Sequence, residues 1–292
     1  MQNRRQFLAT LGATIGSSAL AHQLSAMPAD SRKYGLQLYT VRDDIGKNLE
    51  GTIQKVAAMG YKEVELAGYG NGQFYGKSTK DFKAMLAGLG LATPSGHYMT
   101  GNHDKKLKGT LLNGWEKAVE DAAEMGHQYM VCAYLFPDER KKLDDYKKFA
   151  ELFSKSAEVC QKSGLQFCYH NHDFEFQSLE GQYPIDILLG GTDKNLVKME
   201  LDMYWITRAG FDPVAFMKKH AGRFPLWHLK DIENSPEKAF AEVGRGTIDF
   251  KRIFAAAKSA GVKHFYVEQD VCKRPPLESI EISYKYLSAS KF

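Results

Sequence analysis

Hydrophobic and polar positions along this chain recur in one unit: the end of an amphipathic helix, a glycine, and a short apolar strand. Five stretches carry the unit, at residues 56–66, 85–97, 122–132, 160–170 and 257–268. A glycine just past the last helical turn adopts the left-handed conformation at little cost. The strands that follow are β-branched or aromatic and nearly continuous in apolar character, which is typical of a sheet buried on both faces.

These glycines recur at intervals of roughly 30 to 40 residues, the length of one strand–helix crossover. Three further strands fit the remaining gaps, so that eight strands begin near residues 34, 62, 92, 128, 166, 197, 224 and 264. Eight parallel strand–helix units close into a barrel. The pattern therefore predicts an α/β protein with a single (β/α)8 TIM barrel. A doubly wound open sheet is the alternative, but the Gly-rich phosphate turn that normally follows its first strand is absent.

Composition is ordinary for a globular protein of 292 residues, with 43% apolar and 25% charged residues. This excludes a disordered chain, a coiled coil or a multispan membrane protein. The net charge of +4 is too balanced to indicate a nucleic-acid partner. None of the four cysteines lies in a CxxC pair, so a zinc knuckle or a thioredoxin motif is not expected.

The N-terminus has the three regions of an export signal in the right order. Arg4 and Arg5 precede an uncharged apolar stretch at residues 9–21, and small residues follow at two candidate cleavage sites. We expect a signal over residues 1–26 and the barrel over residues 27–292. The Arg-Arg-Gln-Phe-Leu run resembles the twin-arginine signal, which predicts a periplasmic protein. The stretch is too short to span a bilayer stably, so no membrane contact is expected after its removal. A basic tail on a cytosolic protein is the alternative.

The carboxyl ends of the predicted strands carry many ionisable side chains. In a (β/α)8 barrel the active site is built at these ends. The residues found there are Gln37, Tyr39, Glu65, His97, His170, His172, Glu200, Asp202, His228, Lys230, Asp231, Glu268 and Asp270. Imidazole and carboxylate ligands from neighbouring strands suit Mn, Co, Zn, Ni or Fe better than Ca, and Mg is also compatible. We therefore expect one divalent metal ion.

Several of these residues also have structural interpretations. His127 and His264 come early in their strands and are interpreted as structural histidines. Glu65 and Glu200 could instead pair with Lys or Arg inside the barrel. Glu268 lies in a strand of Phe, Tyr and Val, where burying its charge without a cation would be costly.

Asp202 could cap a helix, because Asp is favoured at that position. The next helix, however, is predicted to begin about ten residues later, near Asp212. His170 and His172 share one parity along their strand, so both can face the barrel interior.

Together these stretches resemble the sugar phosphate isomerase/epimerase superfamily, the xylose-isomerase-like barrels. The similar stretches are residues 164–175, 201–205, 228–231, 244–250 and 267–270. The resemblance implies that His170, Asp202, His228 and Glu268 hold one divalent metal ion. Ketose 3-epimerases have Glu at the first of these positions, whereas inosose-dehydratase-like members have a similar Tyr-His-x-His run. Either His170 or His172 is then the ligand on that strand.

The resemblance also implies a reaction. The expected function is a metal-dependent sugar isomerase or epimerase that acts through an enediolate on a ketose or keto-sugar. The alternative is a metal-dependent lyase or hydratase of 3-keto-glycosides or inosose-like keto-sugars, by β-elimination. The expected catalytic residues are Glu268, His172 and Lys230, with Glu268 or His172 as the base. The expected substrate contacts are Gln37, Tyr39, Glu65, His97, Trp205, Asp231 and Asp270.

Two other classes of function fit less well. A sugar-binding protein without activity would have two lobes and a hinge, whereas the repeats predict one barrel. An apurinic-site endonuclease shares the fold, but it needs a multi-metal cluster and a basic groove. Without the export signal the charge is close to neutral, so we expect a small sugar or keto-sugar as the partner and no nucleic acid. A homo-oligomer is compatible with the sequence.

Overall fold

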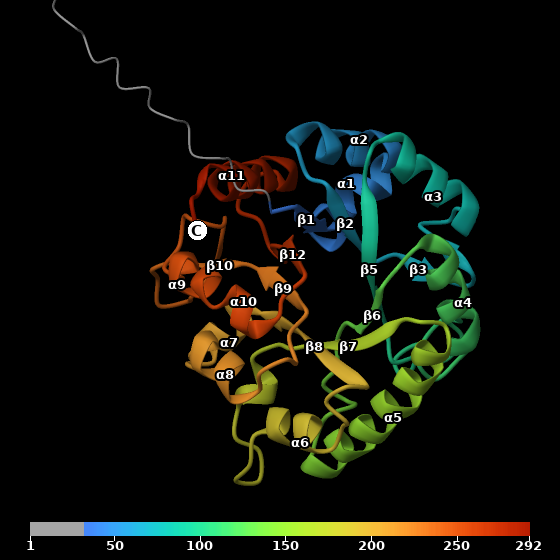
Figure 1. The fold of residues 1–292 in the computed structure, drawn as a ribbon, viewed down its shortest axis with the longest axis vertical. Coiled ribbons are helices and arrows are strands. Elements are labelled where there is room, and N and C mark those ends of the chain that lie inside the picture. Colours follow the sequence, from blue (N-terminus) through green and yellow to red (C-terminus); the bar gives the residue numbers. More distant parts are fainter. Residues whose placement is uncertain (1–31) are drawn as a thin grey trace, which may run out of the picture.

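Eight parallel strands form a closed barrel in the computed structural model, which describes residues 32–292. Neighbouring strands follow the order β1-β12-β9-β8-β7-β6-β5-β2, and β1 pairs with both β2 and β12 to close the ring. Helices surround this ring (Figure 1). The predicted single TIM barrel is therefore confirmed. The predicted export signal over residues 1–26 lies outside the described residues.

All eight barrel strands begin within two residues of the predicted positions. They are β1 (Tyr34–Gln37), β2 (Glu63–Leu66), β5 (Ala92–Tyr98), β6 (Tyr129–Cys132), β7 (Gln166–His170), β8 (Val197–Asp202), β9 (Leu226–Leu229) and β12 (His264–Val267). Most of their residues are buried, because one face of each strand contacts the barrel interior and the other contacts the helices.

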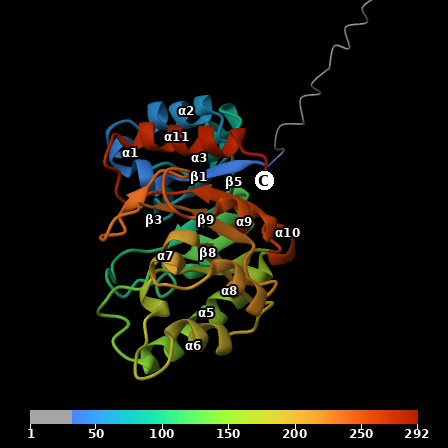
Figure 2. The ribbon, with the colours of Figure 1, turned by 90° about the vertical axis from the view of Figure 1, so that its left-hand side faces the viewer.

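The helices lie outside the ring of strands, as Figure 2 also shows. They are α1 (Arg42–Lys47), α2 (Leu49–Met59), α3 (Thr79–Gly88), α4 (Trp115–Met125), α5 (Leu143–Lys162), α6 (Pro184–Gly190), α7 (Met203–Arg208), α8 (Pro213–Lys219), α9 (Phe250–Ala255), α10 (Ala257–Ala260) and α11 (Pro276–Ala289). Within residues 32–292, none of them is both long and apolar enough to cross a bilayer.

Short elements follow several strands at the carboxyl end of the barrel. Two are 3-10 helices, η1 (Leu38–Val41) and η2 (Phe174–Phe176). Two are small antiparallel hairpins, formed by β3 (Tyr69–Gly70) with β4 (Gln73–Phe74) and by β10 (Asp231–Ile232) with β11 (Phe240–Ala241).

Gly60 illustrates the predicted glycine between helix and strand. It ends α2 with φ of +111°, a conformation that disfavours side chains. A Cβ at this position would also lie 2.3 Å from the hydroxyl oxygen of Tyr284, which donates to the carbonyl of Gly60 over 2.9 Å. Tyr284 belongs to α11, so this contact joins the last helix to α2, and the two helices lie side by side in both views (Figures 1 and 2).

The barrel interior changes in polarity along its axis. Val131, Cys168, Leu226 and Tyr266 form a small apolar cluster inside the ring, separate from the large core between strands and helices. Cys168 and His170 are two residues apart on β7 and so share one face. The apolar cluster therefore forms the floor beneath the ionisable groups at the carboxyl ends of the strands.

Candidate metal centre

Four side chains from the adjacent strands β7, β8, β9 and β12 converge at the carboxyl end of the barrel. Nε2 of His170 lies 3.2 Å from Oδ2 of Asp202. Nδ1 of His228 lies 2.8 Å from Oε2 of Glu268 and 3.7 Å from Oδ2 of Asp202. All four residues are buried, and their ligand atoms lie within 4.8 Å of one another. We call these four residues the metal-ligand group; they are the set that the family resemblance implies.

Other atoms of the group are anchored by hydrogen bonds to the protein. Nδ1 of His170 is 3.2 Å from the carbonyl oxygen of Ala133 and can donate to it, which directs Nε2 toward the group. The backbone amide of Asp202 donates to Oδ1 of Asn171 over 3.0 Å. Such anchoring of a ligand's second atom is typical of protein metal sites.

Asp202 is also the N-cap of a helix. Its Oδ1 accepts a hydrogen bond of 2.9 Å from the backbone amide of Trp205. The predicted helix near Asp212 is confirmed as α8, which starts at Pro213. It is not the next helix after β8, however, because the short helix α7 starts directly after that strand. One carboxylate oxygen therefore caps α7 while the other faces the metal-ligand group.

Two buried atoms of the group make no hydrogen bond. They are Nδ1 of His228 and Oε2 of Glu268, which lie 2.8 Å apart without the geometry of a hydrogen bond. Both atoms are within ion-pair distance of other groups, because Nζ of Lys230 also lies 2.6 Å from Oε2 of Glu268. A divalent cation can accept a lone pair from both, and two nitrogens with two oxygens suit a first-row transition metal. The residues present therefore fit one divalent metal ion.

Lys230 places an ammonium group beside the same carboxylates. Its Nζ lies 2.6 Å from Oε2 of Glu268, 3.0 Å from Oδ2 of Asp202 and 2.9 Å from Oδ1 of Asp270. Burial works against its charge, but the charges of Asp202 and Asp270 outweigh burial and hold the pKa of Lys230 well above its usual value. Lys230 is therefore a fixed positive charge.

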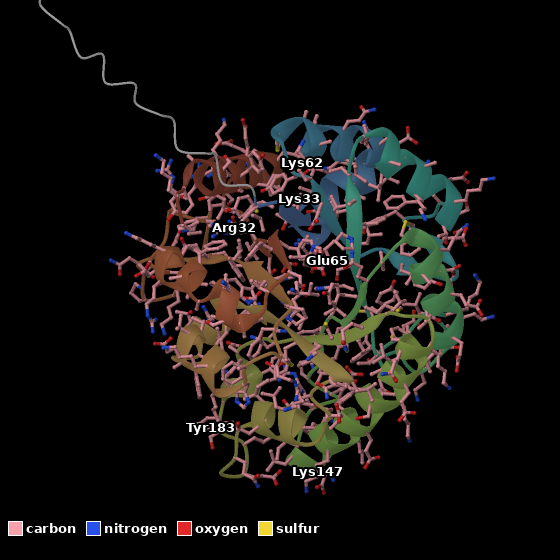
Figure 3. All side chains as sticks on the ribbon, in the orientation of Figure 1. Arg32, Lys33, Lys62, Glu65, Lys147 and Tyr183 are labelled. Carbon is pink, nitrogen blue, oxygen red and sulfur yellow. The ribbon has the colours of Figure 1, made fainter. Side chains whose placement is uncertain are left out.

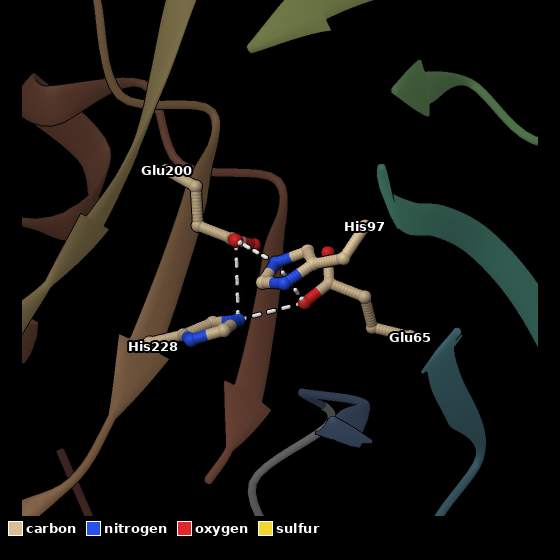
Figure 4. A group of neighbouring side chains, drawn as sticks. All are labelled: Glu65, His97, Glu200 and His228. Carbon is tan, nitrogen blue, oxygen red and sulfur yellow. Dashed lines mark hydrogen bonds and ion pairs between the residues drawn. The ribbon is translucent and has the colours of Figure 1, made fainter. Parts of the chain in front are cut away.

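Glu65, His97, Glu200 and His228 form a second buried cluster, which we call the Glu–His ring (Figure 4). Nε2 of His228 lies 2.7 Å from Oε2 of Glu65 and 3.2 Å from Oε2 of Glu200. Nε2 of His97 lies 2.6 Å from Oε2 of Glu200 and 3.2 Å from Oε2 of Glu65. Within the described residues, both glutamates therefore pair with histidine rather than with Lys or Arg.

The ring lies inside the barrel, where Figure 3 labels Glu65, whereas the labelled Lys147 and Tyr183 lie at the periphery. Burial lowers the pKa of His97, but the charges of Glu65 and Glu200 outweigh it and raise the pKa to about 10. His97 is therefore protonated at neutral pH.

A cavity of about 640 Å³ opens over the metal-ligand group. Its wall includes His172, whose ring contacts the rings of Tyr134, Phe174 and Trp205. Nδ1 of His172 is buried and has no hydrogen-bond partner. Burial, together with the charges of His170 and Lys230, holds the pKa of His172 well below its usual value. His172 is therefore a neutral imidazole on the cavity wall, and it is not among the four residues whose ligand atoms lie within 4.8 Å of one another.

Most of the predicted site residues line this cavity. They are Tyr39, His97, His170, His172, Trp205, Lys230, Glu268 and Asp270. Gln37 and Glu65 lie beneath it, where Nε2 of Gln37 donates to Oε2 of Glu65 over 2.8 Å. Asp231 is not on the cavity wall, because its buried carboxylate accepts hydrogen bonds from four backbone amides, as described below.

The loops after β6 and β7 supply cavity residues that the sequence analysis missed. Tyr134, Phe136, Arg140 and Phe174 line the cavity, and the Arg140 guanidinium lies 3.4 Å from the centre of the Phe174 ring. The strand ending at Cys132 has no His, Asp, Glu or Lys at its end, so it offered no candidate. The aromatic residues directly after this strand were the sequence feature that could have indicated these cavity residues.

Comparison with known proteins finds a matching family and similar barrels. The family described as "Xylose isomerase-like TIM barrel" matches residues 53–289. An inosose dehydratase of Lacticaseibacillus casei is 25% identical over 280 residues, covering 85% of this chain and 92% of that protein.

Two crystal structures of sugar phosphate isomerases/epimerases from Parabacteroides distasonis ATCC 8503 are similar along nearly their whole length. One is 26% identical with a TM-score of 0.78 and covers 89% of this chain and 99% of that one. The other is 30% identical with a TM-score of 0.75 and covers 91% and 96%.

Proposed function

The chain belongs to the xylose isomerase-like TIM barrel family, and from this membership we propose that it is a divalent-metal-dependent enzyme that enolises a keto-sugar. The observation that carries the proposal is the buried group of His170, Asp202, His228 and Glu268 beneath a cavity of about 640 Å³. A divalent ion held there would polarise the substrate carbonyl and acidify the neighbouring C–H bond.

The protein's own residues supply the remaining chemistry. His172 is neutral and its Nδ1 has no partner, so it can accept the proton from the carbon next to the carbonyl. Lys230 and His97 carry positive charge at the cavity wall, where they can hold substrate oxygens that gain negative charge. Trp205 and Tyr39 offer aromatic faces to the sugar ring.

We favour β-elimination as the outcome of enolisation. Neutral His172 can accept the proton from the carbon next to the carbonyl and, once protonated, return a proton to the departing β-oxygen, which leaves as water or alcohol. The Lys230 ammonium keeps its charge through this step and can hold the substrate oxygen that gains negative charge. The inosose dehydratases among the similar proteins support this choice. An isomerase or epimerase is the second candidate, and the names of the two Parabacteroides distasonis structures favour it. It would return the proton to the same or the adjacent carbon.

Metal analysis combined with solvent exchange tests the proposal. We expect about one divalent ion per chain and, in D₂O, loss of the hydrogen on the carbon next to the carbonyl, over a panel of ketoses, inososes and 3-keto-glycosides. Elimination would release water or the aglycone, whereas an epimerase would incorporate deuterium without loss of oxygen. A metal-free protein that removes this hydrogen from none of these substrates would refute the proposal.

Two single-histidine variants, one at the site and one away from it, form a matched test. His172→Gln should abolish removal of the hydrogen next to the carbonyl while metal binding persists, because His172 lies outside the metal-ligand group. His264→Gln removes a histidine that contacts Glu63 near the opposite end of the barrel, at 2.8 Å, and should leave this step unchanged. Equal losses in both variants would contradict the role of His172.

We also propose that the protein is exported, as the residues before the barrel predict. Replacing Arg4 and Arg5 by Lys keeps their charge but changes the twin-arginine pair. The unprocessed precursor should then accumulate in the cytoplasm, as cell fractionation would reveal. Undiminished export of the double variant would contradict a twin-arginine route.

A further inference from the structure

The two ring nitrogens of His228 have different surroundings. Nε2 makes a hydrogen bond of 2.7 Å with Oε2 of Glu65 and lies 3.2 Å from Oε2 of Glu200 (Figure 4). Nδ1 is buried, makes no hydrogen bond, and faces the metal-ligand group, where Oε2 of Glu268 lies at 2.8 Å. Both nitrogens therefore have carboxylate oxygens nearby, but only Nε2 has one in the geometry of a hydrogen bond.

A neutral imidazole carries one proton, and the hydrogen bond that one nitrogen makes decides which nitrogen is free to ligate a metal. We propose that Glu65 and Glu200 are positioning residues that hold the proton of His228 on Nε2, so that Nδ1 is presented as a metal ligand. This inference rests on the proposed metal site and assigns a role to the carboxylates beneath it.

The Glu–His ring is built to keep these carboxylates in place. Glu65 also accepts hydrogen bonds from Nε2 of Gln37, over 2.8 Å, and from the hydroxyl of Ser95, over 2.5 Å. His97 lies between the carboxylates and bridges them, at 2.6 Å from Oε2 of Glu200 and 3.2 Å from Oε2 of Glu65.

The ring also spans the barrel lumen. Its members come from β2, β5, β8 and β9, and both glutamates are fully buried. Because four strands of one closed sheet fix the side chains, the acceptors of His228 do not depend on a mobile loop.

Nuclear magnetic resonance of ¹⁵N-histidine-labelled protein tests the inference directly in the unaltered chain. With one equivalent of Zn²⁺, we expect His228 to carry its proton on Nε2 and to bind zinc through Nδ1. The His228 signals are assigned by their absence in His228→Gln. A proton on Nδ1, or zinc bound through Nε2, would overturn the proposal without requiring a Glu65 or Glu200 variant to fold.

Zinc affinity supplies the second test. Glu65→Gln and Glu200→Gln should each weaken Zn²⁺ binding about 10–100-fold, the usual cost of losing a carboxylate behind a ligating histidine. Glu63→Gln is the matched control, because Glu63 is on the same strand and contacts Nδ1 of His264, at 2.8 Å. An equal loss of affinity in the control, or unchanged affinity in both ring variants, would overturn the proposal.

Stoichiometry separates this inference from the proposed function. If the unaltered protein binds no Zn²⁺, the proposed metal enzyme itself fails. If it binds one ion and the ring variants retain full affinity, only the positioning role fails. Two ions per chain, falling to one in Glu200→Gln, would mean that the ring is itself a metal site, and this result would also overturn the positioning role.

Discussion

The two carboxylate oxygens of Asp202 have separate roles, and a substitution can remove one role while it keeps the other. Asn can still accept the hydrogen bond from Trp205 that caps α7, but it brings no negative charge to the metal-ligand group. Asp202→Asn should therefore abolish stoichiometric Zn²⁺ binding and also lose stability, because it removes the charge that pairs with buried Lys230 at 3.0 Å. Asp202→Ala should lose the ion, the same ion pair and, with the helix cap, about 1 kcal/mol more of unfolding free energy.

Calorimetric titration with Zn²⁺ and urea unfolding of the metal-free proteins measure these two effects. Full zinc affinity in Asp202→Asn would show that Asp202 is only a helix cap.

Glu175 is a buried carboxyl group whose charge is unfavourable in the folded protein. Burial raises its pKa from 4.5 to about 7, although hydrogen bonds from the Tyr169 hydroxyl and the His172 backbone amide partly oppose the shift. Between pH 4.5 and 7 the folded chain binds a proton that the unfolded chain has lost. Stability should therefore fall as the pH rises through this window, by about 3 kcal/mol at most.

Glu175→Gln tests this expectation, because Gln resembles the protonated acid and does not titrate. The stability of the variant relative to the unaltered protein should increase by about 3 kcal/mol between pH 4 and pH 8. Urea unfolding at both pH values measures the difference. A difference that is the same at both pH values would show that Glu175 keeps an ordinary pKa.

Side-chain chemistry at strand ends could be predicted from the sequence, but the partner of each side chain could not. The positions of His170, Asp202, His228 and Glu268 followed from strand parity and the family resemblance. The cap formed by Asp202 was considered, but the helix that it caps was missed, because α7 has only six residues and follows its strand without a linker. Glu200 was known as an ionisable strand residue, but its contact with His97 crosses the barrel, and no local pattern encodes that contact.

Asp231 organises a loop segment rather than the cavity. Its carboxylate accepts hydrogen bonds of 2.8–3.0 Å from the backbone amides of Ile232, Gly244, Gly246 and Ile248. Gly246 is required by this close packing, because a Cβ there would lie 2.2 Å from the carbonyl oxygen of Ile232.

Replacing Asp231 by Ala should leave four amides without an acceptor. We expect a loss of about 2–3 kcal/mol in unfolding free energy and faster hydrogen exchange at Gly244, Gly246 and Ile248, with zinc stoichiometry unchanged. Urea unfolding and amide exchange measure these effects. Loss of zinc from a variant of normal stability would instead indicate that Asp231 belongs to the metal site.

The larger elements of the fold were more predictable than the smaller ones. Most barrel strands follow turn or helix-end residues and are rich in apolar residues, and the count of eight was correct. The β3–β4 and β10–β11 hairpins were missed, because strands of two residues carry no periodic pattern. These hairpins follow β2 and β9, two strands that contribute to the Glu–His ring.

Over the whole molecule, the metal-ligand group joins residues that are far apart in sequence. Its members lie between residues 170 and 268 on four adjacent strands, so the unfolded chain does not bring them together. A ligand that binds only the folded chain stabilises it by about 4 kcal/mol when its free concentration is about 1,000 times Kd. For a chain of this size each kcal/mol raises Tm by roughly 2–4 °C.

Saturating Zn²⁺ should therefore raise Tm by roughly 8–16 °C, and a chelator should reverse the change. The ion binds only the folded chain, because its four ligands come from four adjacent parts of the barrel wall. The buried carboxylates there outnumber lysine, so a cation is stabilising. Differential scanning calorimetry measures the shift, and Asp202→Asn, which keeps its helix cap, should show none. An equal rise in that variant would mean that zinc stabilises the barrel from another site, whereas no rise in the unaltered protein would contradict a metal centre on these four strands.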